Sequence, residues 1–222
     1  MGIFSHKFLQ GREMKKFLHV GCGPKNKEQT TVVFNSDEWE EVRLDIDESV
    51  KPDIIASLND LSVIEDGSYD AIFSSHNIEH LFPHEVDIAL KEFNRVLNKN
   101  GYLLITCPDL KAVAKFVAED KLLDILYESP AGPITPLDVL FGHRASLQQG
   151  NLYMAHKCGF TRSVLLGLMS TAGFKALTGA ERPNTFDLWA IGTKNDELLP
   201  ADTADMLKEH LNITDDTNVT YD

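Results

Sequence analysis

The stretch that decides the fold is Phe17-Leu-His-Val-Gly-Cys-Gly-Pro24, a short apolar run that leads directly into two glycines. Its first four residues are enough for a buried strand. Gly21 and Gly23 bracket one small residue, so the backbone can turn sharply there and approach a ligand closely. In open α/β sheets such turns lie at the carboxyl end of the first strand, where ligands bind. The residues that follow therefore indicate which ligand this loop binds.

Composition and charge narrow the class of protein. The chain has 222 residues, with 43% hydrophobic and 25% charged residues, as in a globular protein that forms one large α/β domain or two small ones. The net charge of -13 argues against nucleic acid as the main partner. We expect no membrane association and a cytoplasmic location, since no apolar run approaches about 20 residues and the N-terminus lacks the apolar core of a signal peptide.

The pattern downstream of the glycines alternates strands with helices. Residues 24–34 are polar and then β-branched, which predicts that the first helix is shortened or absent. The clearest helix begins at Pro83, carries one apolar stripe and is expected to end at Asn100-Gly101. Strands are expected at residues 17–20, 42–46, 53–56, 69–74 and 102–106. Alternation of this kind predicts a mostly parallel sheet that is covered on both faces.

Four segments make up the expected organisation of the chain. Residues 1–16 form a polar lead-in, 17–194 the single domain, and 195–222 an acidic tail with one helix near residues 204–211. Within the domain, residues 109–160 are an insertion placed to cover a ligand, with a proline-rich break at 129–136 and a polar loop at 142–150. A helix capped by Thr161 then leads to two strands, at 174–181 and 186–193, that are expected to pair antiparallel.

A family resemblance rests on four stretches in order: Leu18-His-Val-Gly-Cys-Gly23, Val42-Arg-Leu-Asp-Ile-Asp47, residues 66–81 and residues 92–101. Over residues 17–194 the chain resembles the class I, S-adenosylmethionine-dependent methyltransferases, in a small, type-11-like branch of unassigned substrate. The resemblance implies a Rossmann-like, doubly wound, mostly parallel seven-stranded sheet with a C-terminal antiparallel hairpin. It also implies S-adenosylmethionine as cofactor and S-adenosylhomocysteine as product.

The predicted cofactor site lies around the glycine loop. Asp45 follows Gly23 by 22 residues, the spacing of an acid that binds ribose hydroxyls. The resemblance places Ser57 and Leu58 beside the adenine. Two family acids are replaced, one by His19 and one by Ser57, and the loop lacks a third glycine. The full expected set is His19, Gly21, Cys22, Gly23, Asp45, Ile46, Ser57, Leu58, Ser74 and Ser75.

The expected catalytic residues are His76, Glu79 and His80, which follow the fourth strand. Methyl transfer is an in-line displacement that mainly requires alignment and a dry site, and a base is needed only if the acceptor must lose a proton. His76 is the candidate base, with Glu79 or His80 orienting it; the alternative is that these residues only pack around the cofactor. In the insertion, the candidates for contact with the acceptor are His143, Tyr153 and His156.

We predict no metal site. His76, His80 and His84 are spaced by four residues, but Pro83 interrupts the helix that could align them as zinc ligands beside Glu79 or Glu85. The three cysteines give neither paired metal-ligand spacing nor a disulfide framework, and Cys22 is interpreted as a small turn residue rather than a nucleophile.

Two other classes of function stay open at this point. A nicotinamide-dependent oxidoreductase shares the strand, loop and acid, but usually has a third glycine where this chain has Asn26. A non-catalytic protein that keeps the cofactor fold is the other alternative. The acidic chain and its polar insertion favour a small hydroxylated or nitrogenous acceptor, such as a sugar or metabolite, methylated on oxygen or nitrogen. The sequence does not indicate the oligomeric state.

Overall fold

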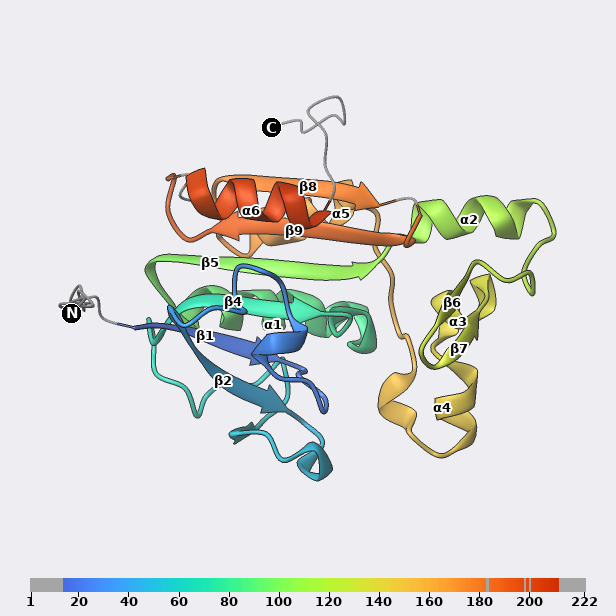
Figure 1. The fold of residues 1–222 in the computed structure, drawn as a ribbon, viewed down its shortest axis with the longest axis horizontal. Coiled ribbons are helices and arrows are strands. Elements are labelled where there is room, and N and C mark those ends of the chain that lie inside the picture. Colours follow the sequence, from blue (N-terminus) through green and yellow to red (C-terminus); the bar gives the residue numbers. More distant parts are fainter. Residues whose placement is uncertain (1–13, 183, 198, 200, 212–222) are drawn as a thin grey trace, which may run out of the picture.

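The computed structural model describes residues 14–182, 184–197, 199 and 201–211, and its centre is a seven-stranded sheet (Figure 1). The strand order is β3-β2-β1-β4-β5-β9-β8. The strands are β1 (Lys15–Val20), β2 (Trp39–Asp45), β3 (Ile54–Ile55), β4 (Tyr69–Ser75), β5 (Leu97–Pro108), β8 (Leu177–Arg182) and β9 (Asp187–Thr193). The first five pair in parallel, and β9 runs antiparallel to both β5 and β8. The predicted sheet and its terminal hairpin are confirmed.

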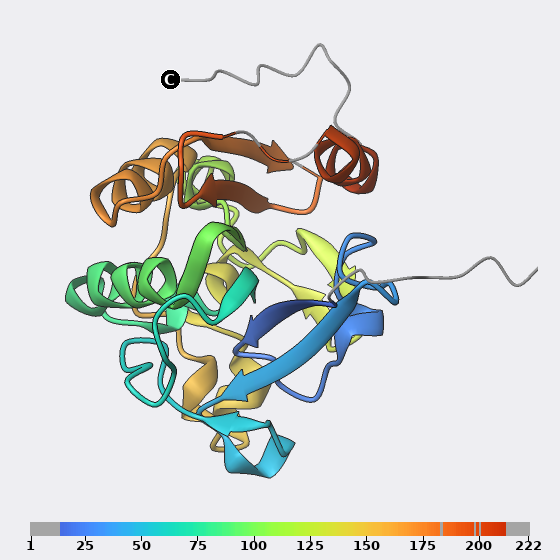
Figure 2. The ribbon, with the colours of Figure 1, turned by 90° about the vertical axis from the view of Figure 1, so that its left-hand side faces the viewer.

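Helices lie on both faces of the sheet (Figure 2). Helices α1 (Pro83–Val96) and α5 (Arg162–Thr171) cover one face, and α6 (Ala201–Leu211) lies on the other. The second face is also covered by the loop after β1, which contributes Val33 and Phe34 to the core. That loop contains only a short 3-10 helix, η1 (Lys27–Gln29), so the prediction of a shortened first helix is confirmed.

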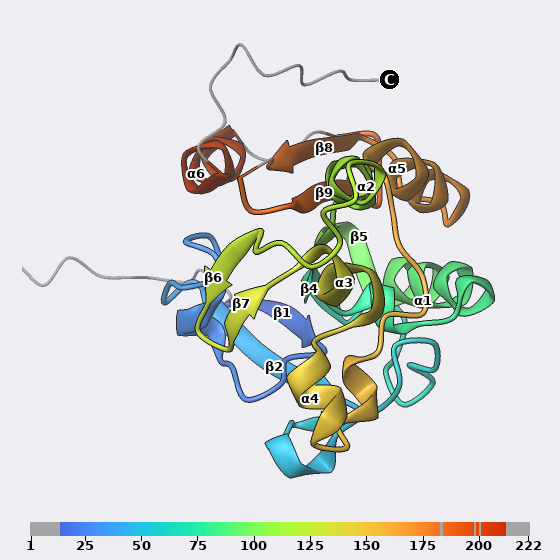
Figure 3. The same cartoon turned by 90° about the vertical axis from the view of Figure 1, so that its right-hand side faces the viewer.

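The segment 109–160, called the cap below, lies across the carboxyl ends of the parallel strands (Figure 3). Its elements are α2 (Leu110–Ala118), β6 (Tyr127–Ser129), β7 (Gly132–Ile134), α3 (Pro136–Phe141), α4 (Arg144–Gln148) and η4 (Leu152–Met154). It has a small core of its own around Val113, Ile134 and Val139. Two sequence-based expectations were wrong here: the proline-rich break at 129–136 overlaps the β6–β7 hairpin, and the polar loop 142–150 contains α4.

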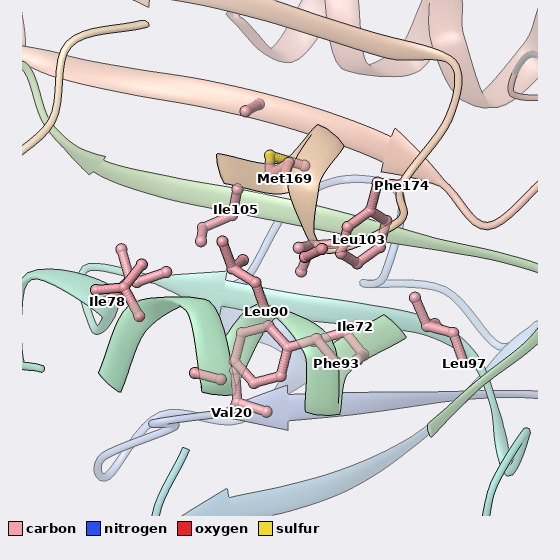
Figure 4. Packing of buried hydrophobic residues seen from close by; sticks show 14 of the residues in the cluster. Val20, Ile72, Ile78, Leu90, Phe93, Leu97, Leu103, Ile105, Met169 and Phe174 are labelled. Carbon is pink, nitrogen blue, oxygen red and sulfur yellow. The ribbon is translucent and has the colours of Figure 1, made fainter. Parts of the chain in front are cut away.

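Alternation along the strands divides the main core into two layers. In β1, Leu18 and Val20 belong to the layer that faces α1 and α5, whereas Phe17 belongs to the opposite layer with Phe34. Figure 4 shows the first layer, where Phe93 of α1 packs among residues of β4 and β5. Burial of large apolar side chains on both faces stabilises the sheet and fixes the register of its strands.

The residues that precede helices α2 and α5 are expected to differ in their contribution to stability. The Asp109 carboxylate accepts hydrogen bonds from the backbone N–H groups of Lys111 and Ala112 at the start of α2. Thr161 precedes α5, but its hydroxyl lies 3.3 Å from the Ser163 hydroxyl and makes no capping bond. We therefore expect Asp109→Ala to lower the free energy of unfolding by about 1 kcal/mol. Thr161→Ala is expected to lower it by less than about 0.5 kcal/mol. Urea unfolding measures both, and equal losses would contradict the assignment of the caps.

Several boundaries differ from those expected. Strand β1 begins at Lys15, two residues before the predicted start of the first strand at position 17; residues 1–13 of the predicted lead-in lie outside the described residues. Helix α1 ends at Val96 rather than at Asn100-Gly101, because Leu97 is already extended and pairs with Tyr69 of β4. In the predicted tail, α6 begins before the expected residue 204, and residues 212–222 lie outside the description.

Within the part of the chain that the structure describes, each helix is too short or too polar to cross a membrane.

Candidate cofactor and acceptor site

The glycine loop sits at the carboxyl end of β1, and its two glycines have different reasons to be there. Both have positive φ, +59° at Gly21 and +54° at Gly23, a backbone conformation that residues with a side chain rarely adopt. A Cβ on Gly21 would lie 2.1 Å from Oδ1 of Asn77, whereas a Cβ on Gly23 would meet nothing within 4 Å. Gly21 is therefore required by packing inside the protein, and Gly23 leaves open space beside the loop.

Asn77 is a structural residue of this site that the sequence analysis missed. Its Nδ2 donates to the backbone oxygen of Val20 at 2.9 Å and to that of Ser75 at 3.0 Å. These bonds join the carboxyl ends of β1 and β4 directly beside the loop. The available signal was a polar amide two residues after a buried strand, which by itself does not say what it binds.

Asp45 ends β2 next to the same loop, as the spacing predicts. Its Oδ2 accepts a hydrogen bond from the Gly23 N–H at 2.7 Å, and its Oδ1 accepts one from the Asp47 N–H at 2.9 Å. A carboxylate has about four acceptor positions, so two such bonds leave capacity for a ligand. Ile46 follows and is 47% exposed.

Ser57 and Leu58 follow β3 after Ala56, on the far side of Asp45 from β1. The Ser57 hydroxyl donates to Oδ1 of Asn59 at 2.6 Å, and Asn59 donates in turn to Glu85. Leu58 packs against the main core. Both residues are partly buried, so the structure brings the segment expected beside the adenine to the same edge of the sheet as Asp45.

His19 is built into the sheet beneath the loop. The imidazole is buried, and its Nδ1 lies 2.7 Å from Oε1 of Glu41 on β2. The other carboxylate oxygen of Glu41 accepts from the Lys27 N–H at the start of η1. The pair therefore links β1, β2 and η1, and the structure gives His19 a partner within the protein.

Cys22, Ser74 and Ser75 are also at this edge. Burial raises the pKa of the Cys22 thiol to about 11, so it is neutral near pH 7, which agrees with its interpretation as a turn residue. Ser74 is fully buried at the end of β4, and its hydroxyl has no hydrogen-bond partner among the described residues. Ser75 is partly buried.

His76 has left-handed backbone, with φ of +54°, and its N–H donates to the backbone oxygen of Thr106. The side chain is 48% exposed, and its Nδ1 lies 3.5 Å from Oε1 of Glu79. Desolvation acts to lower the pKa of His76, but the neighbouring Glu79 carboxylate outweighs it and raises the pKa. Burial acts to raise the pKa of Glu79, and His76 together with two further imidazoles reverses this and lowers it.

His80 and His156 both lie beside Glu79. Glu79 and His80 belong to the short 3-10 helix η3 (Ile78–His80), and His156 comes from the end of the cap. Donor atoms of the three side chains lie within 4.8 Å of one another, and the two imidazole centroids are 4.9 Å apart. The backbone N–H groups of Lys157 and Cys158 donate to the Glu79 carbonyl and fix the cap against η3.

The other candidate residues, His143, Tyr153 and His84, lie outside the cluster of Glu79, His80 and His156. His143 Nδ1 lies 2.8 Å from the Ser146 hydroxyl within the cap, and Tyr153 is 57% exposed. His84 is exposed at the start of α1 and stacks on Phe82. Neither His76 nor His84 is part of the cluster that Glu79, His80 and His156 form, so the four-residue spacing of the histidines does not gather them as one set.

Residues 18–105 match a family model described as a methyltransferase domain. No curated protein matches the chain. This family match favours a methyltransferase over the nicotinamide-dependent alternative, and S-adenosylmethionine is the cofactor that it supports.

Solved structures with the same fold include several methyltransferases at low sequence identity. An S-adenosylmethionine-dependent methyltransferase from Methanosarcina mazei is 17% identical, with a TM-score of 0.54 over 84% of this chain and 95% of its own. The 1,6-didemethyltoxoflavin-N1-methyltransferase of Burkholderia thailandensis, solved with bound 1,6-didemethyltoxoflavin and S-adenosylhomocysteine, is 13% identical, with a TM-score of 0.53 over 82% of this chain and 72% of its own. An S-adenosylmethionine-dependent methyltransferase from Thermotoga maritima is 15% identical, with a TM-score of 0.51 over 83% of this chain and 84% of its own.

Proposed function

We propose that this chain, whose residues 18–105 match a family model described as a methyltransferase domain, is a class I, S-adenosylmethionine-dependent methyltransferase that transfers the methyl group to an oxygen or nitrogen of a small-molecule acceptor. One observation carries the proposal. The open space at Gly23, the carboxylate of Asp45 and the half-exposed imidazole of His76 follow three strands that end at the same edge of the sheet. Cofactor and acceptor groups therefore face one region, as transfer between two bound molecules requires.

The cofactor is proposed to lie along the ends of β1, β2 and β3. Asp45 has acceptor positions left for the two ribose hydroxyls, and the space at Gly23 accommodates the methionyl part. Ile46, which is exposed, offers an apolar surface to the adenine, with Ser57 and Leu58 beyond it. His19 supports the loop from below through Glu41, so its proposed contribution to binding is indirect.

The acceptor is proposed to lie between His76 and the cap. In-line displacement at the sulfonium carbon needs alignment and exclusion of water, and the cap covers this edge of the sheet. The net charge of -13 disfavours a nucleic-acid acceptor, and the polar groups of the cap favour a hydroxylated or nitrogenous metabolite. His76 is the proposed contact residue; whether it also accepts a proton stays a prediction.

A two-step experiment tests the function. Calorimetric titration of the full chain with S-adenosylhomocysteine is expected to show one saturable site, and titration with NADH is expected to show none. Turnover is then measured with S-adenosylmethionine against a panel of hydroxylated and amine metabolites and RNA. Methylation of a metabolite supports the proposal. Methylation of RNA alone, or cofactor binding without transfer to any member of a broad panel, contradicts it.

His76→Ala tests the acceptor side of the site once an acceptor has been identified. Loss of one hydrogen bond to the acceptor is expected to lower kcat/KM about tenfold, because such a bond contributes about 1.4 kcal/mol. The affinity for S-adenosylhomocysteine is expected to stay within about twofold. His84→Ala, an exposed histidine eight residues away, is the control and is expected to change neither quantity. An unchanged kcat/KM in His76→Ala would contradict the assignment.

A further inference from the structure

Glu79 is a buried acid whose carboxylate lacks hydrogen bonds from the described residues. Its side chain is 1% exposed, and neither carboxylate oxygen has a hydrogen-bond partner among the described residues. The ion pair with His76 spans 3.5 Å and involves an imidazole that is half exposed. Burying a charged carboxylate is costly unless it is paired, hydrogen-bonded or bound to a metal. The structure therefore calls for a further positive partner at Glu79.

Two imidazoles beside Glu79 are held in the orientation that metal ligands adopt. Nδ1 of His80 lies 3.1 Å from the backbone oxygen of Ala155, and Nδ1 of His156 lies 2.7 Å from that of Val139. An Nδ1–H group that donates to a carbonyl leaves the lone pair of Nε2 free to bind a metal ion. The carbonyls thus set the tautomer and the direction of both rings.

We propose that Glu79, His80 and His156 bind a divalent transition-metal ion of the zinc type. Two imidazoles and one carboxylate are a donor set that Zn²⁺ uses in three-ligand sites, with a further position left for another ligand. Mg²⁺ prefers oxygen donors and is not matched to this set. Donor atoms of the three side chains already lie within 4.8 Å of one another, so small side-chain rotations bring them to one ion.

The ion joins two parts of the fold. Glu79 and His80 belong to η3, at the carboxyl end of β4, whereas His156 belongs to the cap. Links already present between these parts include the backbone bonds from Lys157 and Cys158 to the Glu79 carbonyl, the Cys158 thiol beside the Ile78 carbonyl, and the contact between His80 and Ala155. A metal ion at the cluster therefore holds the cap against the sheet beside the proposed acceptor site.

Metal binding by the full chain tests the proposal directly. After removal of metals with a chelator, titration with Zn²⁺ is expected to show one equivalent bound, with millimolar Mg²⁺ unable to compete. His156→Ala and Glu79→Gln are each expected to weaken Zn²⁺ binding at least 100-fold. His84→Ala and His143→Ala are the controls and are expected to keep the wild-type affinity, because neither residue is in the cluster. Co²⁺ is expected to give a d–d absorption spectrum in wild type that His156→Ala lacks.

Thermal unfolding separates loss of a ligand from loss of the fold. Zn²⁺ is expected to raise the Tm of wild type and of His84→Ala, and to leave that of His156→Ala unchanged. If His156→Ala does not fold, His156→Gln, which keeps a polar side chain, replaces it in both measurements. No saturable Zn²⁺ binding by wild type, or equal binding by the His156 variant, overturns the proposal. These readouts use neither cofactor nor acceptor, so they are independent of the proposed methyl transfer.

Discussion

Asp45→Ala is expected to weaken the binding of S-adenosylhomocysteine about 100-fold. Its carboxylate is the proposed acceptor for both ribose hydroxyls, and hydrogen bonds to a charged group contribute about 1.5–3 kcal/mol. A 100-fold loss corresponds to about 2.8 kcal/mol. The same carboxylate accepts from the Gly23 N–H, so the substitution also removes a bond that holds the glycine loop. Calorimetric titration measures the affinity for S-adenosylhomocysteine. Urea unfolding of the free protein measures how much stability is lost with the bond to the Gly23 N–H.

Asp45→Asn and Asp47→Asn form the matched control pair. Both change a charged group to a neutral one of the same size, two residues apart. Asp47 caps the 3-10 helix η2 (Glu48–Val50) by accepting from the Ser49 N–H, and asparagine keeps that ability. Asp47→Asn is therefore expected to bind S-adenosylhomocysteine like the wild type, and Asp45→Asn much more weakly. Equal effects of the two substitutions would show that net charge, not a contact at Asp45, governs the affinity.

Gly21→Ala is expected to lower the free energy of unfolding by about 3 kcal/mol. The left-handed backbone at this position costs a residue with a Cβ roughly 1–2 kcal/mol. The overlap of the new Cβ with the side chain of Asn77 adds roughly 1–3 kcal/mol. Urea unfolding of the free protein is the measurement, since it does not depend on the cofactor.

Gly23→Ala is the control for Gly21→Ala. Gly23 has nearly the same φ but open space around the Cβ position, so only the backbone cost of about 1 kcal/mol is expected. The double variant Gly21→Ala with Asn77→Gly removes the overlap and is expected to be less destabilised than the sum of the single changes, by more than about 1 kcal/mol. Additive losses would mean that Asn77 does not restrict Gly21.

The arrangement of the sheet could be predicted because the residues that determine it are local. The apolar run before Gly21 and the apolar stripe of α1 each indicate an element by period alone. The position of Asp45 followed from its spacing to Gly23, and the structure places the two residues in hydrogen-bond contact. The end of α1 was misplaced because Leu97 continues the apolar stripe, yet its extended backbone pairs with Tyr69 in the sheet.

Contacts between distant segments could not be predicted. Asn77 is one polar residue among several after β4, and only the structure shows that it bonds the end of β1, 57 residues earlier. His156 comes to Glu79 and His80 from the far end of the cap, so the four-residue histidine spacing, which groups His80 with His76 and His84, does not indicate it. The β6–β7 hairpin was missed because its prolines suggested a break, although an edge strand tolerates proline.

A crystal structure of the chain with S-adenosylhomocysteine is the direct test of the proposed cofactor site. We expect both ribose hydroxyls within hydrogen-bond distance of the Asp45 carboxylate, the methionyl part against Gly23, and the sulfur facing the region between His76 and the cap. A cofactor bound elsewhere, or bound here with Asp45 contacting only its own backbone partners at Gly23 and Asp47, would contradict it.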